Sequence, residues 1–185
     1  ANNGFHDCVF EMAPASGLNA SYDAVVLLKS NGKMDSCRVI GAFGVGGIVN
    51  TLAGDGGGIY TQALNAKIRN CVVTNCHGHG VHLDSSSNKA DIDCAYCTIV
   101  NTRGDGINTA NQTVGTGSKG SLEGNIIYGH AGNGIETNAD DSRQGGAQIL
   151  AMGGNGANFL NMDSYEDMID VITITEADFI DYDNK

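Results

Sequence analysis

The sequence predicts an all-β solenoid, in which short strands of successive coils stack side by side. The first reason is a motif at residues 70–81 that returns 26 residues later at 96–107, with Cys, Asn, two Gly and a β-branched residue at the same offsets. Looser copies lie at 37–48 and 125–135. A repeat period between about 20 and 50 residues is typical of solenoids. The second reason is that no helical pattern separates the copies.

The copies align on one Cys or Asn position, which we call the anchor. The anchors are Cys8, Cys37, Cys71, Cys97 and Asn125. The residues two positions later are all apolar: Phe10, Val39, Val73, Ile99 and Ile127. Because strand side chains alternate between two faces, each anchor shares a face with the residue two positions later. The pattern therefore predicts a strand with an inward apolar face in each coil.

Each coil continues through a Gly-x-Gly turn into a second short strand, as at 80–83 and 106–109. Glycine permits the positive φ or the close backbone approach that such a turn requires. The connectors that follow, such as 84–89 and 109–121, are rich in Gly, Asn and Ser. A βαβ unit would need a helix of about ten residues in every repeat, and these connectors do not supply one.

These repeats resemble the right-handed parallel β-helix, the pectate-lyase-like fold of polysaccharide lyases, polygalacturonases, phage tailspikes and surface adhesins. The resemblance covers residues 5–137 and implies a single-stranded right-handed parallel β-helix of about four to five coils. We expect coils over 1–144 and an irregular segment over 145–185 that closes the helix, with a loop at 145–156 and a strand at 171–175. Neither end looks like a complete solenoid cap, so we expect a piece of a longer chain.

Charge and hydropathy disfavour two kinds of partner. Ten Lys and Arg residues against 21 Asp and Glu residues give a net charge of −11, which repels nucleic acids and anionic membrane surfaces. The longest apolar run, 24–28, is too short to span a membrane. We therefore expect no nucleic-acid partner and no membrane span. The resemblance implies an extracellular, cell-surface or virion location, a possible polysaccharide partner and a homotrimer or larger assembly.

The cysteines form a predicted ladder. Cys94 and Cys97 have the spacing of a redox or zinc pair, but Cys94 shares its repeat position with Phe5, Met34, Ile68 and Leu122. We expect both residues to be buried as small apolar side chains. Coils stack about 4.8 Å apart, so neighbouring anchors lie within disulfide range, although parallel side chains favour free thiols. An oxidised Cys71–Cys97 pair stays open. We predict no metal site and no cofactor, with calcium as the one possible exception.

His79 is a candidate catalytic residue. Residues 78–81, followed by 83–85, look like part of the polygalacturonase signature, in which the histidine lies at the active site. Asp84 stands where that family has Gly, and the acidic elements that supply its catalytic carboxylates do not precede His79. The repeat offers a simpler explanation, because Val45, Asp105 and Asn133 occupy the same offset in other coils.

Carboxylates follow the Gly-x-Gly turns in successive coils. Glycosidic hydrolysis usually needs two of them, and Asp84, Asp105 and Glu136 would line one flank of the solenoid. A lyase would instead need a Lys or Arg base, usually beside bound calcium. The basic residues near the shared faces of the coils are Lys67, Arg69 and Arg103.

Two further sets complete the candidates. Tyr60, Tyr96 and Tyr128 are aromatic side chains that could stack on sugars. Asn75 and Asn101 predict a buried side-chain ladder that satisfies backbone groups of the turns. Together these features favour a non-catalytic structural or adhesive module of a virion spike, fibre or cell-surface protein. The alternative is a carbohydrate-active enzyme, either a glycoside hydrolase or a polysaccharide lyase, with His79, Asp84 and Asp105 as its candidate residues.

Overall fold

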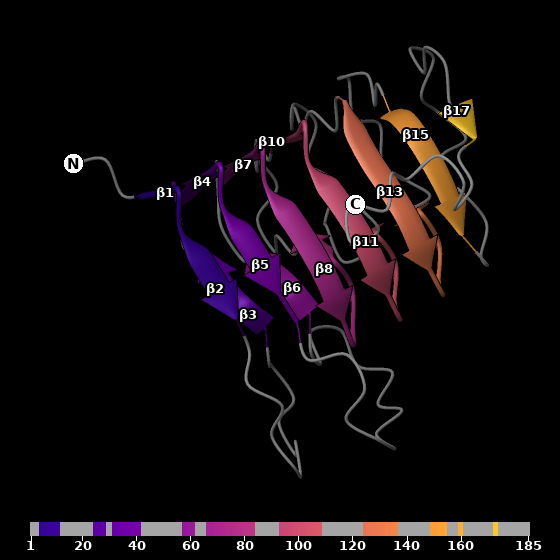
Figure 1. Cartoon of the computed structure of the whole chain (residues 1–185), viewed down its shortest axis with the longest axis horizontal. Coiled ribbons are helices and arrows are strands. Elements are labelled where there is room, and N and C mark those ends of the chain that lie inside the picture. Colours follow the sequence, from indigo (N-terminus) through magenta and orange to yellow (C-terminus); the bar gives the residue numbers. More distant parts are fainter. Residues whose placement is uncertain are drawn as a thin grey trace, which may run out of the picture.

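The computed structural model describes ten segments of the chain. They are residues 4–11, 24–28, 31–41, 57–61, 66–83, 93–108, 124–136, 149–154, 159–160 and 172–173. Within these segments every regular element is a β-strand, and all strand pairs are parallel (Figure 1). The predicted all-β class is confirmed.

The strands form three sheets, named here A, B and C. Sheet A contains β1 (Gly4–His6), β4 (Lys33–Asp35), β7 (Lys67–Arg69) and β10 (Asp93–Ala95). Sheet B contains β2 (Val9–Glu11), β5 (Arg38–Ile40), β8 (Val72–Cys76), β11 (Thr98–Thr102), β13 (Asn125–His130), β15 (Ile149–Gly154) and β17 (Ile172–Thr173). Sheet C contains β3 (Ala24–Leu28), β6 (Gly57–Thr61), β9 (Val81–Leu83), β12 (Ile107–Asn108), β14 (Ile135–Glu136) and β16 (Phe159–Leu160).

Equivalent strands of consecutive coils pair in register. In sheet B, Val73 pairs with Val39 on one side and with Ile99 on the other, and Ile99 pairs in turn with Ile127. These four side chains are completely buried and form one row of the core. Sheets A and C close the core with rows of their own: Met34, Ile68 and Cys94 from sheet A, and Ile59, Val81, Ile107 and Ile135 from sheet C. The result is a single-stranded right-handed parallel β-helix, as the sequence predicts.

Two residues, the second of which is the anchor, join each strand of sheet A to the next strand of sheet B. The residue before each anchor has a positive φ: 53° at Asp7, 55° at Ser36, 52° at Asn70, 57° at Tyr96 and 68° at Gly124. Left-handed backbone turns the chain sharply within one residue, and Asn, Asp and Gly tolerate it better than other residues. The bend therefore fixes the angle between the two sheets in every coil.

The anchor thiols support this bend. Each Sγ lies within hydrogen-bonding distance of the carbonyl oxygen two residues earlier, which belongs to the end of the sheet A strand. The pairs are Cys8–His6 at 3.3 Å, Cys37–Asp35 at 3.3 Å, Cys71–Arg69 at 3.1 Å and Cys97–Ala95 at 3.4 Å. A thiol is small enough for the core and still offers a weak S–H donor. Both properties explain why cysteine recurs at this position.

Asn125 replaces the thiol in the next coil and makes stronger bonds. Its Nδ2 donates to the Cys94 carbonyl oxygen at 2.9 Å, and its Oδ1 accepts from the Cys97 backbone N–H at 2.9 Å. The side chain is completely buried, so these bonds compensate for its removal from water. Asn125 thus joins two coils at the bend.

All six cysteines are free thiols, as expected. Of the anchor cysteines, Cys37, Cys71 and Cys97 are buried and Cys8 is half-buried. Contact with the Cys97 thiol, together with burial, raises the pKa of Cys71 well above its ordinary range. Burial raises the pKa of Cys76 to about 12. These thiols are therefore poor nucleophiles at neutral pH.

The strands beyond residue 144 continue the sheets. β15 pairs with β13, β16 pairs with β14, and β17 pairs with β15. The predicted loop at 145–156 is wrong at 149–154, because parallel backbone pairing overrides the weak strand propensity of this Gly-rich stretch. The predicted strand at 171–175 is confirmed at 172–173.

Candidate functional site

The turns between sheets B and C bring His79, Asp105 and Asn133 into one row. The backbone N–H of Gly80 donates to Asp105 O at 2.9 Å, and that of Gly106 donates to Asn133 O at 2.9 Å. These bonds place the three residues side by side in consecutive coils. The shared repeat offset of His79 and Asp105 therefore corresponds to physical contact.

Asp105 is buried, and both oxygens of its carboxylate accept hydrogen bonds. Its side chain carboxylate accepts the backbone N–H of Asn133 on Oδ1 at 2.6 Å and Nδ2 of Asn108 on Oδ2 at 2.6 Å. His79 Nδ1 lies 3.1 Å from the same Oδ2. The residue is only 3% exposed. Burial by itself would raise the pKa of Asp105, but the bonds to His79, Asn108 and Asn133 outweigh it and hold that pKa below its ordinary range.

His79 has two ways to bind Asp105. Its Nδ1 lies 3.0 Å from the Asp105 backbone nitrogen as well as 3.1 Å from the carboxylate. In the neutral ring an unprotonated Nδ1 accepts the backbone N–H, whereas in the imidazolium the protonated Nδ1 donates to the carboxylate. Either form keeps this ring nitrogen occupied by Asp105.

Asn108 connects Asp105 to a second carboxylate. Its Nδ2 also lies 3.3 Å from Glu136 Oε2, and the two residues pair in register between β12 and β14. Burial, and next the hydrogen bond and negative charge of Asp105, raise the pKa of Glu136. The two carboxylates therefore have pKa values displaced in opposite directions. A pair displaced in this way is typical of an acid and a base at an active site, and it also arises in structural networks.

A row of side chains on sheet C continues the site. Tyr60, His82, Asn108 and Glu136 pair in register, and the first three are 7%, 2% and 6% exposed. The His82 ring lies between two others, with centroids 5.0 Å from Tyr60 and 5.3 Å from His79. We call Tyr60, His79, His82, Asp105, Asn108 and Glu136 the polar row. Such a buried polar surface is unusual for residues that alternate with core positions.

The predicted site residues are only partly brought together. His79 contacts Asp105, and Asn108 connects Asp105 to Glu136. Asp84, the third carboxylate of the predicted flank, lies outside the described residues. His82 and Asn108 were missed, although the alignment carries the signal, because both follow the Gly-x-Gly turn at the offset of Glu136.

The three candidate tyrosines do not converge. Tyr60 belongs to sheet C and its ring lies against His82, so it offers no open face. Tyr128 is half-buried in sheet B, and Tyr96 lies at the bend after sheet A with 49% of its surface exposed. Of the three, Tyr96 alone presents a largely exposed side chain.

Asn75 and Asn101 form a ladder, but at the surface. Asn101 Nδ2 donates to Asn75 Oδ1 at 3.4 Å, and both residues have a φ of 58°. Asn101 is exposed and Asn75 is half-buried, so the prediction of a buried ladder is wrong. The physical reason is that the left-handed residue interrupts the alternation of the strand, so Val73 and Cys76 are both buried and Asn75 between them is not. Gly129, with a φ of 69°, follows at the same offset, and a Cβ there would lie 2.8 Å from Asn101 Oδ1.

The described segments contain no group of three or more His, Cys, Asp or Glu side chains that could hold a metal ion. Nor do they contain a helix long and apolar enough to cross a membrane.

Comparison with known proteins agrees with the coil geometry. Residues 1–149 match the family described as the right-handed beta helix region, and the chain belongs to that family. No curated protein and no solved structure matches the chain significantly.

Proposed function

We propose that this chain is a non-catalytic structural or adhesive β-helix module of a virion spike, fibre or cell-surface protein. The observation that carries the proposal is the state of Asp105. This best-placed catalytic carboxylate is 3% exposed, and both of its oxygens already accept hydrogen bonds from protein groups. A general base or nucleophile must reach the substrate, and this carboxylate is buried with both oxygens already bonded to protein groups.

The bonds of the polar row support a mechanical role. His79, Asp105 and Asn133 belong to three consecutive coils, and each bond between them crosses a coil boundary. Buried and fully bonded polar networks hold neighbouring elements in one arrangement. A module that transmits force or presents a long surface needs this stiffness along its axis.

A glycoside hydrolase is the second candidate, because one observation favours it. The pKa of Glu136 is raised and that of Asp105 is lowered, which would suit a general acid beside an ionised partner. A lyase has less support, since the candidate base Arg103 is exposed and its Nη1 lies 3.4 Å from His77 Nδ1.

The test is release of reducing or unsaturated ends from a panel of acidic and neutral polysaccharides, with and without calcium. The non-catalytic module produces none. The matched control is Asp7→Asn, which changes an exposed carboxylate at the first bend. Release of sugar ends that is lost in Glu136→Gln and kept in Asp7→Asn would establish the hydrolase instead. Both variants should first be shown to melt as folded proteins.

A further inference from the structure

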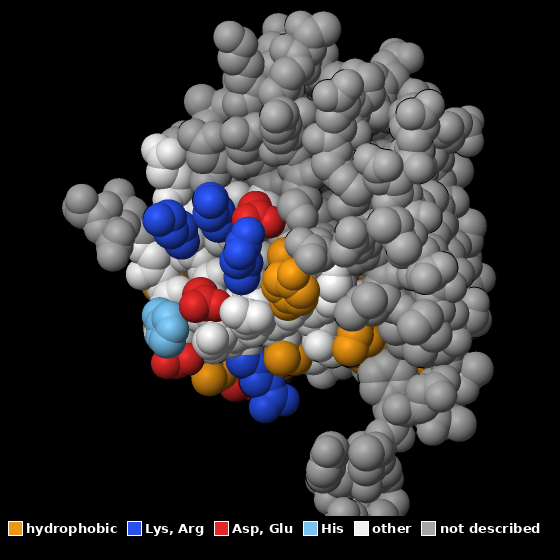
Figure 2. Space-filling model, turned by 90° about the horizontal axis from the view of Figure 1, so that it is seen from above, with side chains coloured by type: hydrophobic (Ala, Val, Ile, Leu, Met, Phe, Trp, Pro, Cys, Tyr) orange, Lys and Arg blue, Asp and Glu red, His pale blue; other side chains and the backbone are white. Residues whose placement is uncertain are grey.

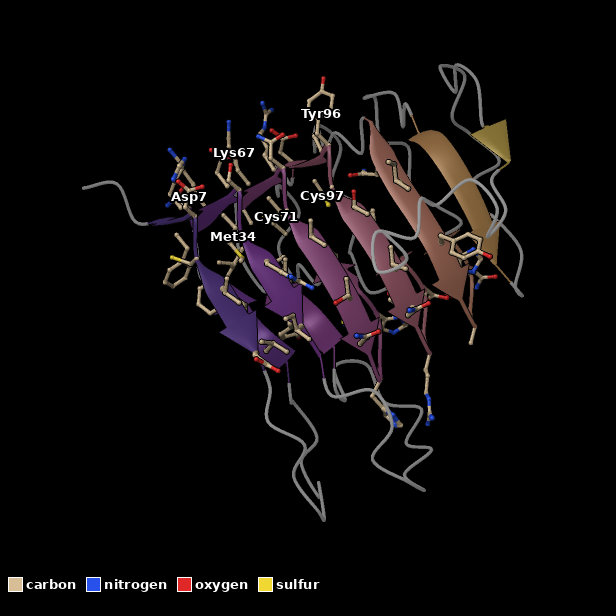
Figure 3. The ribbon with its side chains drawn as sticks, in the orientation of Figure 1. Asp7, Met34, Lys67, Cys71, Tyr96 and Cys97 are labelled. Carbon is tan, nitrogen blue, oxygen red and sulfur yellow. The ribbon has the colours of Figure 1, made fainter. Side chains whose placement is uncertain are left out.

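Sulfur atoms line one corner of the solenoid core. Six sulfur-containing residues belong to the core or pack against it: Cys8, Cys37, Cys71, Cys97, Cys94 and Met34. The first four are the anchors of consecutive coils, and the other two lie on the inner face of sheet A, three residues before an anchor. Figure 3 shows Met34, Cys71 and Cys97 at the corner where sheets A and B meet. Sulfur is therefore the recurring side-chain donor along this corner.

Cys71 and Cys97 bring two of these sulfur atoms together. Both residues are 1% exposed, and their thiols are in hydrogen-bonding contact. The residues that follow them, Val72 and Thr98, pair in register, so the two thiols occupy equivalent positions in neighbouring coils. Such positions lie about 4.8 Å apart. A disulfide needs its sulfur atoms about 2.05 Å apart on converging side chains, which parallel neighbours do not provide.

The charged side chains of sheet A lie on its outer side, away from the thiols. Lys67 and Arg69 are exposed, and Ile68 between them is buried. Figure 2 shows Lys and Arg side chains beside acidic ones on the face seen from above. Within the described segments no group of three or more His, Cys, Asp or Glu side chains could hold a metal ion, so they offer no tetrahedral zinc site. A linear site needs two sulfur ligands only.

We propose that Cys71 and Cys97 hold one soft monovalent cation of the Cu(I) class in linear coordination between two coils. With the zinc–thiolate bond length of about 2.3 Å as a guide, two bonds in line span about 4.6 Å, close to the spacing of the coils. Soft cations prefer sulfur ligands over nitrogen and oxygen. The site revises the sequence-based expectation of no metal site, and it is independent of the proposed function of the module.

The core stays neutral when this ion enters. One thiol loses its S–H bond and forms the metal–thiolate bond, the other thiol binds through a sulfur lone pair, and one proton is released to water. The single thiolate cancels the charge of the ion, and no atom is oxidised or reduced. Burial disfavours the ionised thiol, so a site with one thiolate forms more easily than a divalent site, which needs two.

The experiment uses Ag(I) as the probe, because it is soft and monovalent and keeps its oxidation state. The reduced chain is titrated in an excess of a small monothiol, which removes silver from single accessible thiols such as Cys8. A preorganised pair keeps the ion through its high effective concentration. Native mass spectrometry should find one Ag(I) per chain, and the melting temperature should rise because the ion binds the folded arrangement. Zn(II) should not raise it.

Alanine variants locate the ion. Cys71→Ala and Cys97→Ala should each weaken Ag(I) binding by at least about tenfold, because each removes a ligand. The matched control Cys76→Ala removes another buried thiol, and Cys8→Ala removes the half-buried one. Both controls should bind Ag(I) like the wild type. Each variant is first shown to melt cooperatively.

X-ray absorption of the silver-loaded wild type gives a measurement that needs no variant. Two sulfur neighbours of the silver are expected, with no nitrogen or oxygen neighbour. Four results would each overturn the inference: no Ag(I) retained by the wild type, wild-type affinity in either anchor variant, an equal response to Zn(II), or nitrogen or oxygen neighbours in the absorption spectrum.

Discussion

The backbone N–H of Asn133 donates to Asp105 Oδ1 at 2.6 Å and so joins two consecutive coils through a carboxylate. The pKa of Asp105 lies below its ordinary range in the folded chain, which has a definite consequence for acid stability. Ionised Asp105 therefore stabilises the folded chain at pH values above about 3.9, the pKa of Asp in the unfolded chain. This contribution is lost as the pH falls from there through the pKa of Asp105 in the folded chain.

We therefore expect the melting temperature to fall steeply with acidification below about pH 4. Asp105→Asn should flatten this part of the profile, because its side chain does not titrate. Thermal melts between pH 2 and pH 7 would measure both slopes. An unchanged slope in Asp105→Asn would show that other carboxylates dominate acid unfolding.

Glu136 should behave in the opposite sense. Its folded pKa is raised, so the folded state binds the proton more readily than the unfolded state, and stability falls as pH rises from about 4.3 through the folded value. Glu136→Gln removes the repulsion with Asp105 and should raise the melting temperature at pH 7. The gain should vanish near pH 4, where the Glu136 carboxyl of the folded wild type is itself protonated and neutral. A lower melting temperature at pH 7 would contradict this account.

A charged side chain at a buried anchor position should prevent folding. Cys71 and Cys97 are each 1% exposed, so Cys71→Asp or Cys97→Asp would bury a carboxylate beside apolar neighbours at a cost of several kcal/mol. Neither variant should give a cooperative melt by circular dichroism. Cys8→Asp is the matched control, because Cys8 is half-buried in the first coil, and it should still fold. Wild-type melting in both core variants would refute the alignment of the anchors.

The reactivity of each thiol should depend on its burial. In the native protein we expect Cys8 to react with a thiol reagent at pH 8, and the five buried cysteines to react after denaturation. Titration of thiols with and without guanidinium counts them directly. Fast modification of Cys97 in the native state, located by mass spectrometry, would contradict its burial.

Tyr96 should lower the stability of the fold, because its backbone is left-handed. Left-handed backbone costs about 1–2 kcal/mol for most residues and less for Asn, so Tyr96→Asn should stabilise the chain by up to about 1 kcal/mol. Urea unfolding would measure the gain, and Asn70→Ala at the equivalent bend provides the reverse control. A loss of stability in Tyr96→Asn would mean that the ring contact with Gly124 outweighs the strain.

The sequence predicts the coils well because their determinants are local. Alternation along each strand, Gly at each turn and a Cys or Asn anchor in each coil already place Val73 beside Ile99. The strand at 149–154 could not be predicted, because its stability comes from pairing with β13 and not from its own composition.

The site was less predictable, because its contacts depend on how coils stack. Repeat offsets place His79 beside Asp105, but they do not reveal that Asn108 lies within reach of both Asp105 and Glu136.

The central claim is that the Asp105 network holds the coils together and does not catalyse a reaction. The most direct test measures Asp105→Asn at pH 7 for two properties, the free energy of unfolding in urea and the release of sugar ends from the polysaccharide panel. The account predicts a loss of about 2–4 kcal/mol in stability, because buried partners lose a charged acceptor, with no release from either protein. Unchanged or increased stability, together with wild-type release that the variant lacks, would identify Asp105 as a catalytic residue and contradict the account.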